Sequence, residues 1–205
     1  MAERDLAPGL RYFPGHFDRP VQEALVAAIR QVVVEAPLFV PRMPRTGKPM
    51  SVRMTNCGPL GWVTDKAGGY RYQPVHPESG RPWPAIPDAL LALWNEVSGF
   101  EKPPEACLVN FYDPDARMGL HQDRDETEFA APVVSVSLGD QCLFRVGGVS
   151  RSDPTRSFRL ASGDVFVFGG ESRLIFHGVD RIYPGTSTLL KNAGRINLTL
   201  RRVNP

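Results

Sequence analysis

The chain of 205 residues is long enough for one domain with a sizeable core. Its hydrophobic content of 42% and charged content of 22% are ordinary for a globular protein. The formal net charge of +2 does not by itself indicate a nucleic-acid-binding protein, although it is compatible with a local basic surface.

Cysteine usage and hydropathy exclude several other classes of protein. The three cysteines, Cys57, Cys107 and Cys142, are odd in number and widely spaced, which argues against a disulfide framework and for a reducing compartment. The first residues contain no apolar segment typical of a secretory signal, and no apolar run approaches the ~18 residues of a membrane span. We therefore expect a cytoplasmic protein without a membrane partner. No dimerisation segment is evident, so we expect a monomer.

Two helices are expected in the first half of the chain. The first spans about 20–36, with Asp18 as its N-cap, Pro20 in its first turn and Pro37 ending it. Its apolar stripe consists of Val21, Leu25, Ala28, Ile29 and Val32. The second helix spans about 87–98 and ends at Gly99. Its inward residues are Leu90, Leu93, Trp94 and Val97. Both stripes predict packing of the scaffold.

Residues 38–82 differ in composition from the rest of the chain. They are rich in proline and glycine, and basic residues alternate with aromatic ones: Phe39, Arg42, Arg45, Lys48, Arg53, Trp62, Lys66, Tyr70, Arg71 and Tyr72. This mixture suits single-stranded nucleic acid, because cations meet phosphates and rings stack on bases. A proline-rich covering loop with its aromatic side chains in the core would have the same composition. Composition alone leaves both interpretations open.

The chain after residue 106 is a succession of short apolar segments separated by Gly, Asp and Pro. The expected strands are 106–112, 133–138, 142–146, 157–160, 164–168, 173–177 and 194–202. Short strands at this spacing predict a β-sandwich or jelly roll. The expected fold class is therefore mainly β with flanking helices (α+β).

Three residues have the spacing of a metal site. His121 and Asp123 are two positions apart, and His177 follows Asp123 by 54 positions. Residues two apart on an extended strand point to the same side, so the first pair can face one metal. Two histidines and one carboxylate form the facial triad of non-haem Fe(II), which leaves the opposite face of the ion open. An isolated His-x-Asp is common and usually structural, so the prediction depends on the residues around it.

The last expected strand has one polar face and one aliphatic face. Residues 195–201, RINLTLR, place four polar side chains on the same side, namely Arg195, Asn197, Thr199 and Arg201. An inward-facing arginine needs an anionic partner, because a buried unpaired charge is very costly. A dicarboxylate cosubstrate would supply two anionic ends, and the guanidinium fork binds carboxylates bidentately. Asn110 and Tyr112 likewise share one face of 106–112.

Four stretches of the chain resemble one known family. Residues 110–139, NFYDPDARMGLHQDRDETEFAAPVVSVSLG, resemble the core of the AlkB family of Fe(II)/2-oxoglutarate dioxygenases, as do 163–178 and 195–201. Residues 54–62, MTNCGPLGW, are similar to the bacterial members that repair alkylated nucleic acid. The resemblance implies a single domain over 1–205, with a double-stranded β-helix core at 106–203 and a nucleotide-recognition lid at 38–82. It also implies a bacterial cytoplasmic enzyme.

The resemblance assigns roles to the residues of the metal and cosubstrate sites. His121, Asp123 and His177 would bind Fe(II), with 2-oxoglutarate and O2 as cosubstrates. Arg195 would hold the distal carboxylate of 2-oxoglutarate with the help of Asn110 and Tyr112. Arg201 would lie near the proximal carboxylate, and Asn197 would support this pocket.

The resemblance also implies a set of substrate-binding residues. Trp62 would stack on the target base opposite His121. Asp125 would lie near the exocyclic amine of that base, with Glu126 as its neighbour. Tyr70 and Arg151 would contact phosphates. For Asp125 and Arg151, a solvated loop charge is the alternative interpretation.

The implied activity is oxidative demethylation of N1-methyladenine and N3-methylcytosine in single-stranded DNA, with RNA left open, releasing formaldehyde, succinate and CO2. Both bases are cationic on their pairing edge, which Asp125 could complement, and both must leave the stack to react. One alternative is a dioxygenase of the same fold acting on modified tRNA, a protein or a small molecule. The other is a non-catalytic jelly-roll module with a structural metal. An open metal face beside a dicarboxylate pocket argues against that module.

Overall fold

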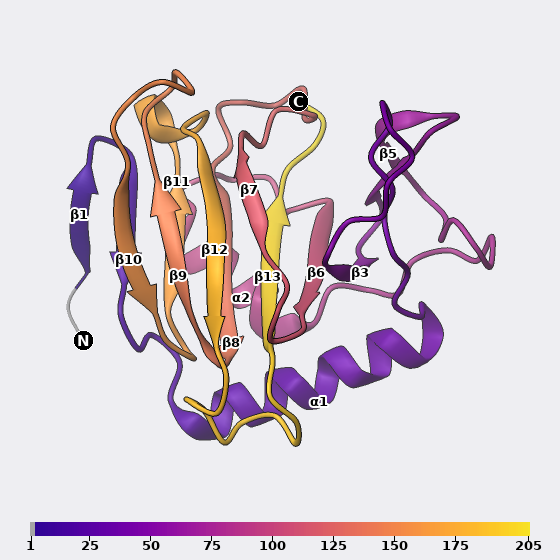
Figure 1. Cartoon of the computed structure of the whole chain (residues 1–205), viewed down its shortest axis with the longest axis horizontal. Coiled ribbons are helices and arrows are strands. Elements are labelled where there is room, and N and C mark those ends of the chain that lie inside the picture. The colour runs from indigo at the N-terminus through magenta and orange to yellow at the C-terminus, as the bar shows by residue number, and fades with distance from the viewer. Residues whose placement is uncertain (1–2) are drawn as a thin grey trace.

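Two β-sheets packed face to face form the body of the protein, and the computed structural model describes residues 3–205 (Figure 1). The larger sheet has seven strands in the order β1 (Arg4–Ala7), β2 (Leu10–Phe13), β11 (Val165–Phe168), β8 (Val133–Gly139), β13 (Arg195–Arg201), β6 (Ala106–Tyr112) and β3 (Arg53–Cys57). The smaller sheet has four strands in the order β10 (Arg156–Leu160), β9 (Gln141–Val146), β12 (His177–Tyr183) and β7 (Met118–His121). The predicted jelly-roll core, mainly β with flanking helices, is confirmed.

Alternation along the strands separates two cores. In β11, Val165 and Val167 pack with the helices, whereas Phe166 and Phe168 pack between the sheets. The aliphatic residues of β13 also face the helices, so its polar face is directed between the sheets. The period of two in β-strands therefore produces both the helix-covered core and the polar pocket.

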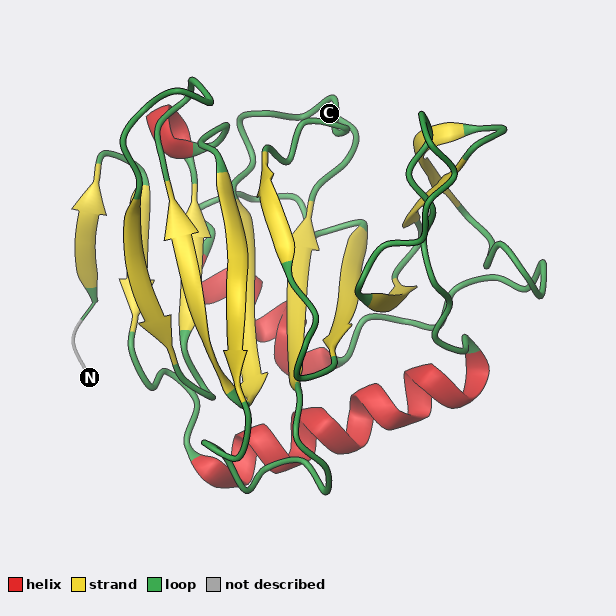
Figure 2. Ribbon diagram, viewed as in Figure 1, coloured by secondary structure: helices red, strands yellow, loops and turns green. Residues whose placement is uncertain are grey.

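Two helices cover the outer face of the larger sheet (Figure 2). Asp18 is the N-cap of helix α1 (Arg19–Glu35), as predicted. Its Oδ1 accepts from the backbone N–H of Val21 at 3.0 Å. Helix α2 (Asp88–Val97) buries all four residues predicted to point inward. The stripe predicted for α1 was wrong at Val21, which is 36% exposed at the start of the helix, while Val26 is buried.

One predicted strand was misplaced. Residues 173–177 do not form a strand, because Gly170–Ser172 form a short 3₁₀-helix (η1) and β12 begins only at His177. The side chain of Arg173 is buried there and donates to the backbone carbonyls of Ala131 and Asp123. These hydrogen bonds hold the start of 173–177 in a turn, and the apolar residues of this segment give no sign of that turn.

The distinctive segment 38–82 has two structural parts. Its strand β3 belongs to the larger sheet, beside β6, and was not predicted. Strands β4 (Gly61–Asp65) and β5 (Gly69–Gln73) form a separate hairpin, which stands beside the sheets in Figure 1. No helix among residues 3–205 is long and apolar enough to cross a membrane.

Candidate active site

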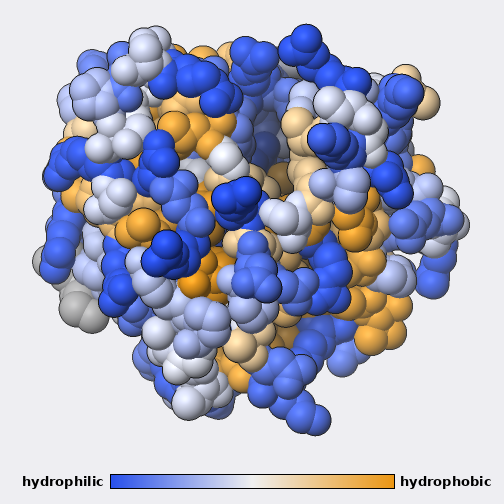
Figure 3. Space-filling view, in the orientation of Figure 1, coloured by the Kyte–Doolittle hydropathy of each residue, from blue (hydrophilic) through white to orange (hydrophobic). Residues whose placement is uncertain are grey.

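A pocket of about 670 Å³ opens between the two sheets and the β4–β5 hairpin. Strands β6, β7, β8, β12 and β13 supply its floor and walls, and β4 and β5 supply part of its rim. The hydropathy surface in Figure 3 is hollowed near the hairpin. All three residues of the predicted triad and the polar face of β13 line this one pocket.

The predicted metal ligands are brought together. His121 ends β7, His177 begins β12, and the two are directly paired across the small sheet. Asp123 lies in the loop after β7, with its carboxylate oxygens 3.7 Å from His121 Nε2 and 3.6 Å from His177 Nε2. The three ligand atoms lie within 4.8 Å of one another. This geometry suits a single ion held on one face.

Both histidines are oriented by their second ring nitrogen. Nδ1 of His121 lies 2.9 Å from the carbonyl oxygen of Gly119, and Nδ1 of His177 lies 3.1 Å from that of Ile175. A carbonyl only accepts, so each Nδ1 carries the proton and each Nε2 presents a lone pair. The backbone thus fixes the tautomer that a metal needs.

Charge at the triad also favours a cation. Burial lowers the pKa of His177 to about 4, so its imidazole is neutral at pH 7. Burial opposes ionisation of Asp123, but Arg201, followed by the two histidines, holds the pKa of this carboxyl well below its usual range. The site therefore offers a neutral nitrogen of His177 and a carboxylate at neutral pH.

Arg195 is a buried cation with unused donors. It is 1% exposed, and its Nη2 donates to Ser137 Oγ at 2.9 Å. Its Nε and Nη1 are buried and have no hydrogen-bond partner in the part of the chain that the structure describes. A buried guanidinium with unused donors in the lining of a pocket fits an anionic partner such as a carboxylate. The Tyr112 ring lies beside it, with the guanidinium carbon 5.2 Å from the ring centroid.

The other predicted cosubstrate residues line the same wall. Burial raises the pKa of Tyr112 to about 12, so its hydroxyl stays a neutral donor. Asn110 is 7% exposed and lies on β6 beside β13. Asn197 donates to Ser135 Oγ at 2.8 Å and accepts from Thr199 Oγ1 at 3.1 Å, so its amide is oriented by its neighbours.

Arg201 lies closer to the metal ligand than the sequence suggested. Its Nη2 is 2.8 Å from Asp123 Oδ1, and its Nη1 is 2.8 Å from Glu126 Oε1. In this arrangement its charge is balanced by protein carboxylates. Its Nε is buried and has no partner, so one donor of the fork stays unused.

Four of the five residues predicted to meet a base or phosphate line the pocket. The indole Nε1 of Trp62 donates to Asp125 Oδ2 at 2.7 Å, and the ring of Tyr70 stacks on that of Trp62 with a centroid distance of 5.7 Å. Arg151 also lines the pocket and donates to the carbonyl of Leu120 at 2.9 Å. Asp125 is therefore an exposed carboxylate of the loop after β7 that is also bonded to the hairpin.

The prediction for Glu126 needs correction. This carboxylate does not line the pocket; its side chain is fully buried behind it, between Arg173 and Arg201. The loop after β7 returns to the residues that follow β13, where the carbonyl of Val203 accepts from the backbone N–H of Thr127 at 2.8 Å. Sequence adjacency to Asp125 gave no sign of this.

The comparisons with known proteins agree with this geometry. A model of the 2OG-Fe(II) oxygenase superfamily matches residues 9–201. The chain belongs to this superfamily. It is 57% identical over 197 residues to a Caulobacter vibrioides protein named alpha-ketoglutarate-dependent dioxygenase AlkB homolog, covering 96% of this chain and 89% of that one. It is 43% identical over 184 residues to Escherichia coli alpha-ketoglutarate-dependent dioxygenase AlkB, covering 88% and 84%.

A solved structure shows the same superfamily architecture. The structure titled OsALKBH1 superposes with a TM-score of 0.82 at 32% identity, covering 98% of this chain and all of that one. The 2OG-Fe(II) oxygenase fold thus accounts for both sheets and the helices that cover the larger one. The chain is an Fe(II)/2-oxoglutarate-dependent dioxygenase.

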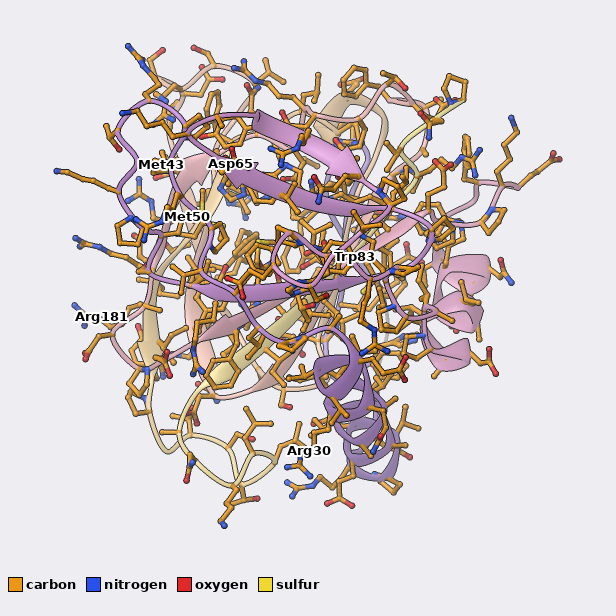
Figure 4. All side chains as sticks on the ribbon, turned by 90° about the vertical axis from the view of Figure 1, so that its right-hand side faces the viewer. Arg30, Met43, Met50, Asp65, Trp83 and Arg181 are labelled. Carbon is orange, nitrogen blue, oxygen red and sulfur yellow. The ribbon has the colours of Figure 1, made fainter. Side chains whose placement is uncertain are left out.

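Several residues in or behind the pocket of this dioxygenase were given no role in the sequence analysis. Met43 and Met50 come from the loop before β3 and line the rim; Figure 4 labels both. Ser135 and Thr199 orient Asn197. Tyr72 reaches the buried charges behind the pocket. Its position two residues after Tyr70, on the same face of β5, was the one available signal.

Proposed function

We propose that this dioxygenase demethylates N1-methyladenine and N3-methylcytosine in single-stranded DNA, acting as a monomer in the bacterial cytoplasm. The observation that supports this most is that one pocket joins the metal triad to a stacking ring, a carboxylate and a cation, namely Trp62, Asp125 and Arg151. An aromatic ring that can stack on a base, together with a cation that can meet a phosphate, is typical of sites that bind single-stranded nucleic acid.

One set of pocket residues would bind the metal, and another would bind 2-oxoglutarate. His121, Asp123 and His177 would hold Fe(II) through two Nε2 atoms and a carboxylate oxygen. Arg195 would pair with one carboxylate of 2-oxoglutarate through its unused donors, with Asn110 and Tyr112 lining the same wall. Bound iron, with 2-oxoglutarate and O2, supplies the oxidation of the N-methyl group, which leaves as formaldehyde while succinate and CO2 are formed.

Arg201 and Asn197 support this arrangement. Arg201 keeps Asp123 ionised and oriented, because its guanidinium is bonded directly to the ligand carboxylate. It would also lie near the proximal carboxylate of 2-oxoglutarate, where its unused Nε is a further donor. Asn197 keeps its amide fixed on the same face of β13.

Base selection would come from the rim. A target base that leaves its stack would lie between the Trp62 ring and the His121 imidazole. Asp125 uses Oδ2 for the indole N–H of Trp62, and its other oxygen stays available to the exocyclic amine. The negative charge favours methylated adenine and cytosine, which are cationic, over the normal bases. Tyr70, which is 48% exposed, and Arg151 would contact flanking phosphates.

We also propose one domain over 1–205 with two functional parts. Residues 106–203 form most of the catalytic core, and residues 38–82 act as the nucleotide-recognition lid through the hairpin. Both interpretations of the lid composition have support: Phe39 is buried in a core cluster, whereas Trp62 and Tyr70 line the pocket.

The test is demethylation of single-stranded DNA oligonucleotides that each carry one N1-methyladenine or N3-methylcytosine. With Fe(II), 2-oxoglutarate and ascorbate, we expect loss of one methylene mass, abolished in His121→Ala and Asp123→Ala. Succinate without loss of mass would reject this substrate, and a methylated tRNA would be tested next. Neither succinate nor loss of mass from folded, metal-loaded protein would reject the enzyme itself.

A further inference from the structure

A buried cluster of two carboxylates and two arginines extends from the pocket wall, where Asp123 and Arg201 lie, to Glu126 and Arg173 behind it. Arg201 bridges Asp123 and Glu126, at 2.8 Å from each. Arg173 Nη2 lies 3.2 Å from Glu126 Oε2, and its Nη1 donates to the backbone carbonyl of Asp123 at 2.7 Å. None of these four side chains is more than 8% exposed. The metal ligand is therefore held at its side chain and at its main chain, and both arginines meet at Glu126.

The hairpin reaches this cluster through one side chain. The hydroxyl of Tyr72, on β5, donates to Glu126 Oε1 and accepts from Arg201 Nη1 at 3.2 Å. Burial, reinforced by the nearby Glu126 carboxylate, raises the pKa of Tyr72 well above its usual value despite Arg201, so the hydroxyl keeps its proton. A hydrogen bond to a buried charged group is stronger than one between neutral groups.

Tyr72 is placed to affect the base-stacking ring directly. It lies opposite Trp62 in the register of the hairpin. Directly paired residues of an antiparallel hairpin project to the same face. A displacement of the hairpin therefore moves the side chains of Tyr72 and Trp62 together. The main chain of Trp62 is also bonded to the buried side chain of Asn56, at 3.0 and 3.1 Å. Asn56 ties the hairpin to β3, whereas Tyr72 ties it to the group that holds the metal ligand.

We propose that Tyr72 is a positioning residue that couples the β4–β5 hairpin to Asp123 through Glu126 and Arg201. These hydrogen bonds and ion pairs set the distance between the Trp62 ring and the metal triad, so that a stacked base has its methyl group where it can react. This inference rests on the proposed demethylase function. Loss of the hydroxyl should loosen the hairpin and let 2-oxoglutarate be consumed without demethylation.

The first test measures how strongly the Tyr72 hydroxyl stabilises the hairpin, and it needs no substrate. In Tyr72→Phe, amide hydrogen exchange of residues 61–73 should be about tenfold faster than in the wild type, while β8 is unchanged. Tyr183→Phe is the matched control, because Tyr183 lies on β12 and its hydroxyl has no hydrogen-bond partner among residues 3–205. Unchanged exchange of the hairpin in Tyr72→Phe would overturn the proposal.

The second test separates positioning from a merely structural role. In Tyr72→Phe the KM for the methylated oligonucleotide should rise about tenfold and the ratio of succinate to formaldehyde should increase. The Kd of 2-oxoglutarate should stay within about twofold, because Arg195 is untouched. A lower kcat with unchanged KM and unchanged ratio would overturn the coupling. A wild-type enzyme that makes succinate but no formaldehyde would instead reject the demethylase function, whatever the exchange result.

Discussion

Replacing Arg195 by methionine should change cosubstrate binding and stability in opposite directions. The side chain is 1% exposed, and two of its nitrogen atoms, Nε and Nη1, have no hydrogen-bond partner among residues 3–205. Each hydrogen bond to a charged group is worth about 1.5–3 kcal/mol, so two bonds to a carboxylate contribute at least about 3 kcal/mol. The Kd of 2-oxoglutarate should therefore rise about 100-fold or more.

The same substitution should not destabilise the ligand-free protein. A buried, incompletely paired charge costs desolvation energy, and an apolar side chain of similar length often replaces it without loss or with a gain of about 1–4 kcal/mol. We expect the Tm of Arg195→Met without cosubstrate to equal or exceed that of the wild type. With metal present in both proteins, addition of 2-oxoglutarate should raise the Tm of the wild type but hardly that of Arg195→Met.

Calorimetric titration of the Mn(II)-loaded protein with 2-oxoglutarate measures the Kd, and thermal denaturation measures the Tm. Arg159→Met is the matched control, since this exposed arginine of β10 lies over the ring of Tyr183, outside the pocket. Binding of 2-oxoglutarate to Arg195→Met within about threefold of wild type would refute the assignment of the two free donors.

Three further predictions concern the triad, the hairpin and the buried cluster. Asp123→Ala should abolish the visible absorption bands of the Co(II)-loaded protein; bands like those of the wild type would show that Asp123 is not a ligand. Trp62→Ala should raise the KM for methylated oligonucleotide by about 10–100-fold, and Trp62→Phe by less, because base stacking is worth about 1–3 kcal/mol; equal effects would refute stacking. Burial opposes ionisation of Glu126, but Arg201 lowers its pKa, so its stabilisation is complete at neutral pH and is lost as the pH falls through the lowered value. Glu126→Gln should therefore cost about 3 kcal/mol of unfolding free energy at pH 7 and respond less to acid below about pH 4; an unchanged acid profile by urea denaturation would contradict this.

The sequence by itself determined the features that depend on local periodicity. Alternation in 195–201 separated the polar face from the aliphatic face, and the structure directs them to the pocket and to the helices. Asp18 and Pro20 determined the start of α1. The residue types at 121, 123 and 177, taken together with the polar face of 195–201 and the resemblance around them, indicated the metal site.

Tertiary structure decided everything that depends on long-range pairing. Strands β1 and β2 carry no clear alternation and exist because β2 pairs with β11. Asp125 and Glu126 are adjacent in sequence, yet one bonds to the indole of Trp62 at the rim and the other is buried between two arginines. A carboxylate takes its role from the cations and donors that surround it, and here those come from β4, β5, β13 and the turn before β12. Only the fold brings these segments together.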